Sequence, residues 1–98
     1  MKSIKAIIKE PGKSSVEKTI SNSFESLQEI VGGPIETVTL PADLCIICNE
    51  EGRLRNLPYN ITKFGVDFVG TIILVGVDKD EFTDVPITWG HISTGSRE

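Results

Sequence analysis

The stretch Thr71–Val77 reads TIILVGV and is the most apolar run of the 98-residue chain. A second run, Leu44–Cys48, reads LCIIC and is apolar at every position. Strands that are buried on both faces have continuous apolar runs, whereas half-exposed strands alternate between apolar and polar residues. The two runs therefore predict a pair of inner strands, each covered on both sides.

Three further segments are expected to extend the sheet around this pair. Ile4–Lys9 is rich in isoleucine, and a turn at Glu10–Lys13 lets Ser14–Ile20 return antiparallel to it. Ile35–Leu40 alternates in the manner of a strand. The pattern predicts an α+β fold with a mainly antiparallel sheet of about five strands and one short helix on one face.

That helix is predicted to begin after Asn22, a favoured N-cap residue with Glu25 three positions later. It is predicted to end at Gly32-Gly33-Pro34, because glycine permits a left-handed cap and proline prevents continuation. Its apolar residues fall on one stripe at helical spacing: Phe24, Leu27, Ile30 and Val31.

One short helix covers only part of one sheet face, so the second face needs another cover. One candidate is the C-terminal tail, residues 83–98, which is expected to be irregular and carries Val85, Ile87, Trp89 and Ile92. The other is a second copy of the chain, which predicts a homo-oligomer. Alternatively, the strands curl into a small barrel around their own core.

Length and charge narrow the functional classes. Residues 1–98 suffice for a single domain. The net charge is −4, with five lysines against two glutamates in residues 1–20 and five basic against twelve acidic groups in residues 21–98. Such a balance disfavours non-specific nucleic-acid binding. No stretch resembles a membrane span or a secretion signal, so a cytoplasmic protein without membrane contact is expected.

Catalytic and metal-binding motifs are not evident. Cys45 and Cys48 are spaced like half a zinc site, but no second pair follows, and residues three apart on a strand point to opposite faces. We therefore predict two buried free thiols, no metal and no cofactor. His91 has no partner at motif spacing. The chain is not expected to be an enzyme, although Glu50 or Glu51 could serve as an acid or base.

The segment Asn49–Asn60 concentrates polar groups that suit a small ligand. Asparagine donates and accepts hydrogen bonds, arginine offers a planar fork for anions, and tyrosine offers a stacking face. Alternatively, the segment is a hairpin turn whose asparagine and glycine residues serve backbone geometry. The predicted ligand-binding residues are Asn49, Glu50, Arg53, Arg55, Asn56, Tyr59 and Asn60.

Four parts of the chain carry a family resemblance: Lys5–Gly12, Leu27–Glu36, Asn49–Leu54 with Leu57–Asn60, and Val69–Ile72 with Val75-Gly76. In this order, over roughly residues 4–82, the chain resembles a family of small domains of unknown function. That family is common in phages, plasmids and integrated elements of Gram-positive bacteria. The resemblance implies a mobile-element context in a bacterial cytosol, and it implies no reaction. The tail, from Asp84 to Trp89, departs from the family pattern.

Two functional hypotheses follow. In the first, the chain is a non-catalytic small-molecule binder that sequesters a nucleotide-derived defence signal, with arginines on phosphates and Tyr59 stacked on a base. In the second, it is an acidic protein-interaction module that occupies the DNA-binding surface of a host enzyme, such as a restriction enzyme. The first needs a concave basic spot, and the second needs carboxylates spread over one continuous face.

Overall fold

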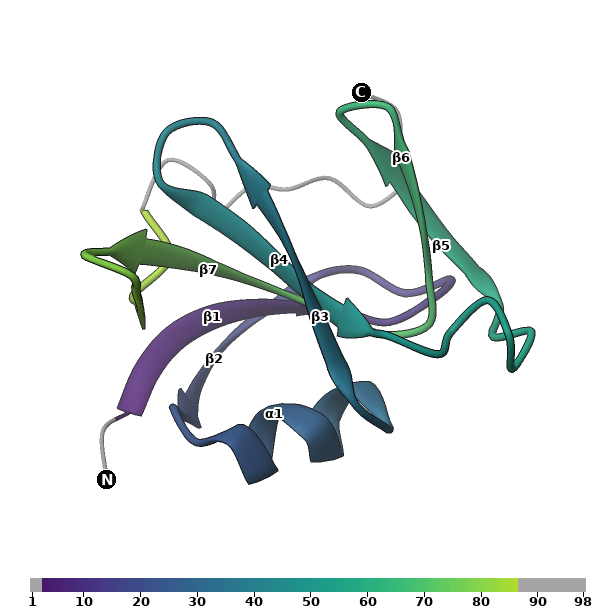
Figure 1. Cartoon of the computed structure of the whole chain (residues 1–98), viewed down its shortest axis with the longest axis horizontal. Coiled ribbons are helices and arrows are strands. Elements are labelled where there is room, and N and C mark those ends of the chain that lie inside the picture. The colour runs from purple at the N-terminus through teal and green to yellow at the C-terminus, as the bar shows by residue number, and fades with distance from the viewer. Residues whose placement is uncertain (1–2, 87–98) are drawn as a thin grey trace.

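A computed structural model describes residues 3–86 (Figure 1), which contain eight strands and one helix. The elements, in chain order, are β1 (Ser3–Lys9), β2 (Val16–Ser21), α1 (Phe24–Val31), β3 (Ile35–Leu40), β4 (Leu44–Asn49), β5 (Tyr59–Lys63), β6 (Val66–Val69), β7 (Ile72–Asp78) and β8 (Glu81–Thr83). No helix in this part of the chain is long and apolar enough to cross a membrane.

The main sheet has the order β2-β1-β7-β4-β3, and every neighbouring pair is antiparallel. Strand β7, the predicted apolar run, lies at its centre, with Leu74 opposite both Ile7 and Ile46. Strands β5 and β6 form a separate two-stranded hairpin. The two predicted inner strands are confirmed, because all six residues of β4 and the first five of β7 are buried.

Strands β1 and β7 pair only over Ile7–Lys9, and the chain after β7 fills the space where they diverge. Strand β8 pairs with the far end of β7. Beyond it, the Val85 amide donates to the Lys5 carbonyl, and the Lys5 amide donates to the Asp84 carboxylate. Gly76 is required here, since a Cβ would stand 2.5 Å from the Asp84 carbonyl oxygen. The beginning of the predicted irregular tail is therefore part of the sheet, whereas Ile87, Trp89, His91 and Ile92 lie outside the described residues.

Helix α1 lies on one face of the sheet (Figure 1), at the position predicted. Its N-cap is Ser23 rather than Asn22, because the Ser23 hydroxyl accepts from the Ser26 amide. The Asn22 side chain instead donates to the Phe82 carbonyl. Gly32 ends the helix in the left-handed conformation, as predicted. The core on this side combines α1 with alternate residues of the inner strands: Leu27, Val31, Cys45, Ile47, Ile73 and Val75.

The β5–β6 hairpin lies over the opposite face of the sheet. Ile61 and Phe68 are buried there against the other alternating set of β4 and β7, including Ile46 and Leu74. The sequence argument expected a tail, a second copy or barrel closure to cover this face. The hairpin supplies much of the cover within one chain, so the uncovered sheet no longer argues for an oligomer, which stays a prediction.

The α+β expectation was wrong, since the described chain is nearly all-β with one small helix. The error has two physical sources. Arg53–Asn60 is polar and contains a proline, yet β5 begins at Tyr59 within it. The apolar run that follows Gly65 spans two strands, because Gly70 takes a φ of 74° and turns the chain between β6 and β7.

A buried polar contact fixes the hairpin to the sheet. The Asn60 amide nitrogen donates to the Lys9 carbonyl at 2.9 Å and to the Gly70 carbonyl at 2.7 Å. The Asn60 oxygen accepts from the Lys9 ammonium at 3.0 Å. Only 6% of Asn60 and 5% of Lys9 are exposed. Burial lowers the pKa of the Lys9 ammonium, whose acceptors are the Asn60 oxygen and, at 3.3 Å, the Glu10 carbonyl.

We expect Asn60→Ala to lower the free energy of unfolding by about 2–3 kcal/mol, because it removes the donor from two buried backbone carbonyls and one of two acceptors from the Lys9 ammonium. Chemical denaturation measures the change. Asn56→Gly is the matched control: Asn56 is exposed with a φ of 54°, so glycine there costs under about 1 kcal/mol. Equal losses in the two variants would contradict a clamping role for Asn60.

Candidate functional site

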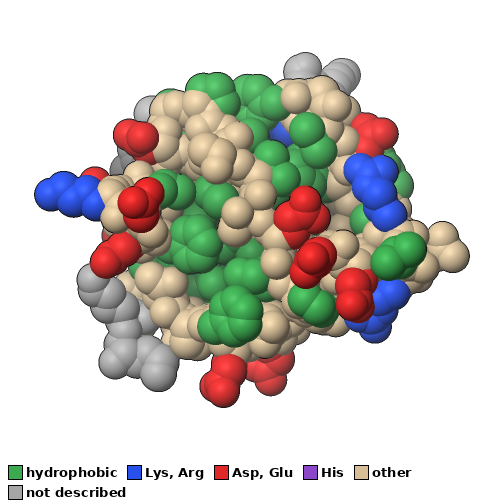
Figure 2. Space-filling model, in the orientation of Figure 1, with side chains coloured by type: hydrophobic (Ala, Val, Ile, Leu, Met, Phe, Trp, Pro, Cys, Tyr) green, Lys and Arg blue, Asp and Glu red, His purple; other side chains and the backbone are tan. Residues whose placement is uncertain are grey.

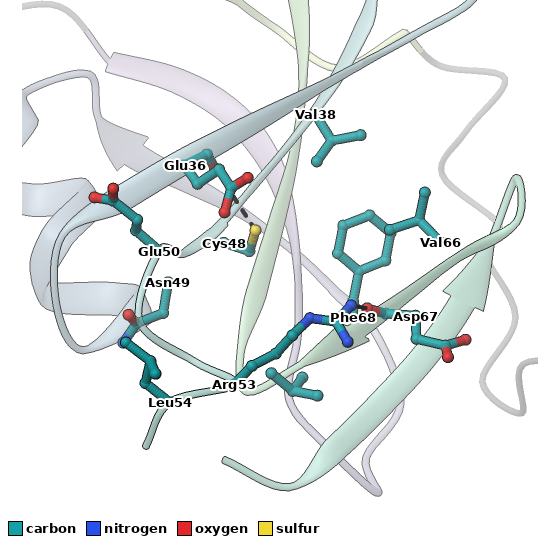
Figure 3. Close-up of a pocket in the computed structure, with 11 residues that line it drawn as sticks. Glu36, Val38, Cys48, Asn49, Glu50, Arg53, Leu54, Val66, Asp67 and Phe68 are labelled. Atoms are coloured by element: carbon teal, nitrogen blue, oxygen red, sulfur yellow. Dashed lines mark hydrogen bonds between the residues drawn. The ribbon is translucent and has the colours of Figure 1, made fainter. Parts of the chain in front are cut away.

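A pocket of about 170 Å³ opens between strands β3 and β4, the outer side of β6 and the loop after β4 (Figure 3). The pocket exists because the β5–β6 hairpin covers only part of the sheet face opposite α1. Strand β6 contacts β4, and β3 lies beyond the end of that cover. The lining residues are Glu36, Val38, Cys48, Asn49, Glu50, Arg53, Leu54, Val66, Asp67, Phe68 and Val69.

The deeper part of the pocket is apolar. Val38 and Cys48 come from neighbouring strands and belong to the same core as Phe68, with Val66 packed beside them. Val38 lies two residues from Glu36 on β3, so both side chains point to the hairpin side of the sheet. Phe68 faces Val38 and Cys48 across the pocket in Figure 3. A flat apolar group would therefore find an aromatic wall and an aliphatic floor.

The polar groups of the pocket are mostly hydrogen-bond acceptors. Three carboxylates, Glu36, Glu50 and Asp67, are present against one cation, Arg53. Glu36 lies beside Cys48 (Figure 3), whereas the Asp67 carboxylate accepts from the Thr62 hydroxyl and turns away. The Arg53 guanidinium donates to the Asp67 carbonyl at 2.7 Å and lies exposed at the rim. Carboxylates accept hydrogen bonds and repel anions.

The Cys48 thiol at the floor is a neutral group. Burial raises its pKa to about 11, and the negative charges of Glu36 and Cys45 add to the shift while Arg53 opposes it. Its sulfur lies 3.7 Å from the Glu36 carbonyl, to which it donates. Since the thiolate is the nucleophilic form, the pocket presents no activated sulfur at neutral pH.

The two cysteines are free and lie on opposite faces of the sheet, as predicted. Cys45 packs in the core beneath α1, and burial raises the pKa of its thiol as well. Among residues 3–86, no group of three or more cysteine, histidine or carboxylate side chains is placed to hold a metal ion.

The pocket brings together three of the seven predicted ligand-binding residues: Asn49, Glu50 and Arg53. Asn49 is also a structural link. Its amide nitrogen donates to the Val31 carbonyl at 3.2 Å, and its oxygen accepts from the Glu51 amide at 2.7 Å. These bonds join the end of α1 to the loop after β4.

The other four predicted residues lie outside the lining, and their contacts serve the loop and the hairpin. Arg55 donates to the Gly32 carbonyl at the end of α1, Asn56 adopts a left-handed turn conformation, and Asn60 is the clamp described above. The Tyr59 hydroxyl lies 2.6 Å from that of Thr62. The aromatic ring at the pocket is Phe68 rather than Tyr59.

Sequence reasoning missed the strand residues of the pocket. Alternation along Ile35–Leu40 places Glu36 and Val38 on one face, a signal that was present. Nothing in the sequence indicated that β6 would stop over β4, which is what brings Val66 and Phe68 opposite them. The predicted residues therefore include the loop side of the pocket and omit the strand residues that line it.

Comparison with known proteins assigns a family. The sequence model for "Domain of unknown function (DUF3846)" matches residues 4–89. The chain belongs to the DUF3846 family. This confirms the resemblance to a domain of unknown function, and DUF3846 membership brings no reaction or ligand with it. No curated protein and no solved structure matches the chain.

The buried thiol of this DUF3846 domain predicts a pH dependence of stability. Above about pH 9 an unfolded cysteine ionises, whereas Cys48 in the folded chain keeps its proton up to about pH 11. Stability that is present below pH 9 is therefore lost as the pH rises through this window. Relative to Cys48→Ala, we expect the free energy of unfolding to fall by up to about 2 kcal/mol between pH 8 and pH 10.5.

Urea denaturation of both variants at pH 8, 9.5 and 10.5 measures this difference. Titratable groups that do not interact with Cys48 are common to both proteins and cancel in the comparison. Parallel pH profiles would show that Cys48 is not protected in the fold.

Proposed function

We propose that this domain is a non-catalytic binding protein whose pocket takes a flat ring with N–H donors, such as the nucleobase of a nucleotide-derived signal. The observation that carries the proposal is the pairing of the Phe68 wall and Val38 floor with the Glu36 carboxylate at the same opening. Phe68, which is 3% exposed, and the half-buried Val38 form an apolar wall against which a flat ring can pack, and a carboxylate accepts from ring N–H and exocyclic amino groups.

The charges favour one orientation of such a ligand. Glu36 and Glu50 line the pocket while the Asp67 carboxylate turns away, so the carboxylates beside the pocket outnumber Arg53 and repel a phosphate. Arg53 lies exposed at the rim, where a phosphate outside the pocket would meet it. The base would therefore enter and the anionic part would remain at the edge. This differs from the sequence hypothesis, in which Tyr59 stacks on the base, because Tyr59 is not part of the lining.

The size of the pocket sets the scale of the ligand contact. Pockets that enclose a whole drug-sized molecule have volumes of roughly 300–1,000 Å³. About 170 Å³ suits a single ring, with the rest of the ligand outside. In the phage or mobile-element setting that the family resemblance implies, a domain that holds the base of a defence signal would act by sequestering it in the bacterial cytosol.

The absence of a catalytic role is proposed from the chemistry at the pocket. The thiol is protonated, and Glu36 and Glu50 lie together without a placed nucleophile among the lining residues. A binder needs no such group.

The acidic interaction module has weaker support. A mimic of DNA needs carboxylates over one continuous face. On the face in Figure 2, acidic groups lie around and between apolar patches and neutral surface. Leu54, which lines the pocket together with Glu36 and Glu50, is an apolar side chain that is 85% exposed.

Titration calorimetry with cyclic dinucleotides and adenosine-ribose signals tests the proposal. We expect Glu36→Gln to weaken binding about tenfold, because the ring N–H then meets a neutral amide oxygen in place of a charged acceptor. Glu36 is exposed, so this change leaves the fold intact. Glu17→Gln on β2 is the matched control and should bind as the wild type does.

The proposal fails if no nucleotide-derived ligand gives heat with the wild type. It also fails if the Glu36 and Glu17 variants bind equally well, since the ligand would then lie elsewhere.

A further inference from the structure

The outer edge of β3 is a strand edge without a neighbour among residues 3–86. Strand β3 ends the order of the main sheet and pairs only with β4. The Glu50 amide donates to the Pro34 carbonyl at 2.7 Å, which makes residues 34 and 50 a hydrogen-bonded pair. Bonded pairs alternate along an antiparallel ladder. The backbone groups of Ile35, Thr37 and Thr39 therefore point away from β4.

The two edge strands of the main sheet, β2 and β3, differ in the features that would prevent another strand from pairing with them. Strand β2, at the opposite end, carries Glu17 and Lys18, both exposed. Strand β3 reads IETVTL, and its one charge, Glu36, lies at the pocket. Lysines, prolines and bulges are the usual protection of an edge strand. Strand β3 has none of them between Ile35 and Leu40 and is rich in β-branched residues.

We propose that β3 pairs with β3 of a second copy, antiparallel and centred on Thr37. A two-fold axis perpendicular to the sheet places Thr37 opposite Thr37, and Ile35 opposite Thr39. In this register each outward-facing residue exchanges two backbone hydrogen bonds with its partner. The next register with matching faces places Ile35 opposite Pro41, which has no N–H to donate. The first register therefore makes the most complete ladder.

The ends of the proposed ladder carry exposed charged residues. In the proposed register, Pro41 of one copy lies opposite Gly33 of the other. The Arg55 guanidinium packs beside Gly33, 3.2 Å from where a Cβ would stand. Asp43, two residues beyond Pro41, is exposed. Arg55 already lies 3.9 Å from its own Glu51 carboxylate, and the Asp43 carbonyl accepts from the Val77 amide on the β7 side, so these charges do not select the partner. A second copy is favoured as the occupant because an identical strand matches the outward backbone groups of Ile35, Thr37 and Thr39 in full.

The two-fold axis also fixes where the pockets lie. It keeps the same sheet face on the same side in both copies, and it places Glu36 opposite Val38 of the second copy. The two pocket floors would then adjoin across the joined edge. The pairing uses backbone groups and does not depend on any ligand, so it stands or falls separately from the proposed function.

Disulfide trapping tests the register. Opposed residues in a bonded antiparallel pair have Cα atoms about 5.5 Å apart, within the range that a disulfide spans. We expect Thr37→Cys to become a covalent dimer under mild oxidation. Thr39→Cys is the matched control, exposed on the same strand, and should stay uncrosslinked because it faces Ile35. The native thiols are buried and should not contribute.

Sedimentation of the proteins without oxidant tests the dimer itself. The wild type should sediment at twice the chain mass at micromolar concentration. Thr37→Lys should reduce it to the mass of one chain, whereas Thr19→Lys on β2 should leave the dimer unchanged. A monomeric wild type, or equal crosslinking of the Thr37 and Thr39 variants, would overturn the proposal.

Discussion

The fold depends on the burial of both faces of β4 and β7. Their side chains alternate between two cores, with Cys45, Ile47 and Ile73 on the helix side and Ile46 and Leu74 on the hairpin side. A fully buried aliphatic side chain contributes about 1.5–3 kcal/mol, so neither set can be left in water by a domain of this size. Two covers are therefore required. Helix α1 is one, and the β5–β6 hairpin, held by Asn60 and Lys9, is the other.

The pocket is a consequence of how this second cover fits. A four-residue strand, β6, reaches across β4 and stops, and the floor from Glu36 to Val38 stays open. The loop after β4 closes one end, because Asn49 ties it to α1 and Arg53 ties it to β6. The same contacts that stabilise the hairpin therefore shape a cavity with an apolar floor and acceptor groups at its mouth. Contacts of this kind hold the geometry before any ligand arrives, which reduces the entropy lost on binding.

Local signals in the sequence predicted the elements well and their assembly poorly. The apolar runs identified β4 and β7, and Gly32 identified the end of α1. The number of strands was underestimated because Tyr59–Lys63 and Val66–Val69 are short and flank polar or glycine residues. These two strands cover the sheet through contacts between residues that are far apart in the sequence, such as Phe68 with Cys48. The spacing of residues along the chain does not reveal such contacts. For the same reason, Asn60 was assigned to a ligand site although it bonds to Lys9.

In strand β3, the even-numbered and the odd-numbered residues serve different parts of the structure. The side chains of Glu36 and Val38 face the pocket, whereas the outward backbone groups belong to Ile35, Thr37 and Thr39. A change at Glu36 therefore alters the pocket without removing a ladder hydrogen bond, and a change at Thr37 alters the edge without entering the pocket. The two properties still share one rigid segment, held by β4 along its whole length. Because β4 already holds this segment, a neighbour added at the edge would leave the floor of the pocket in place, so strand pairing and ligand binding at this site are separate properties of one strand.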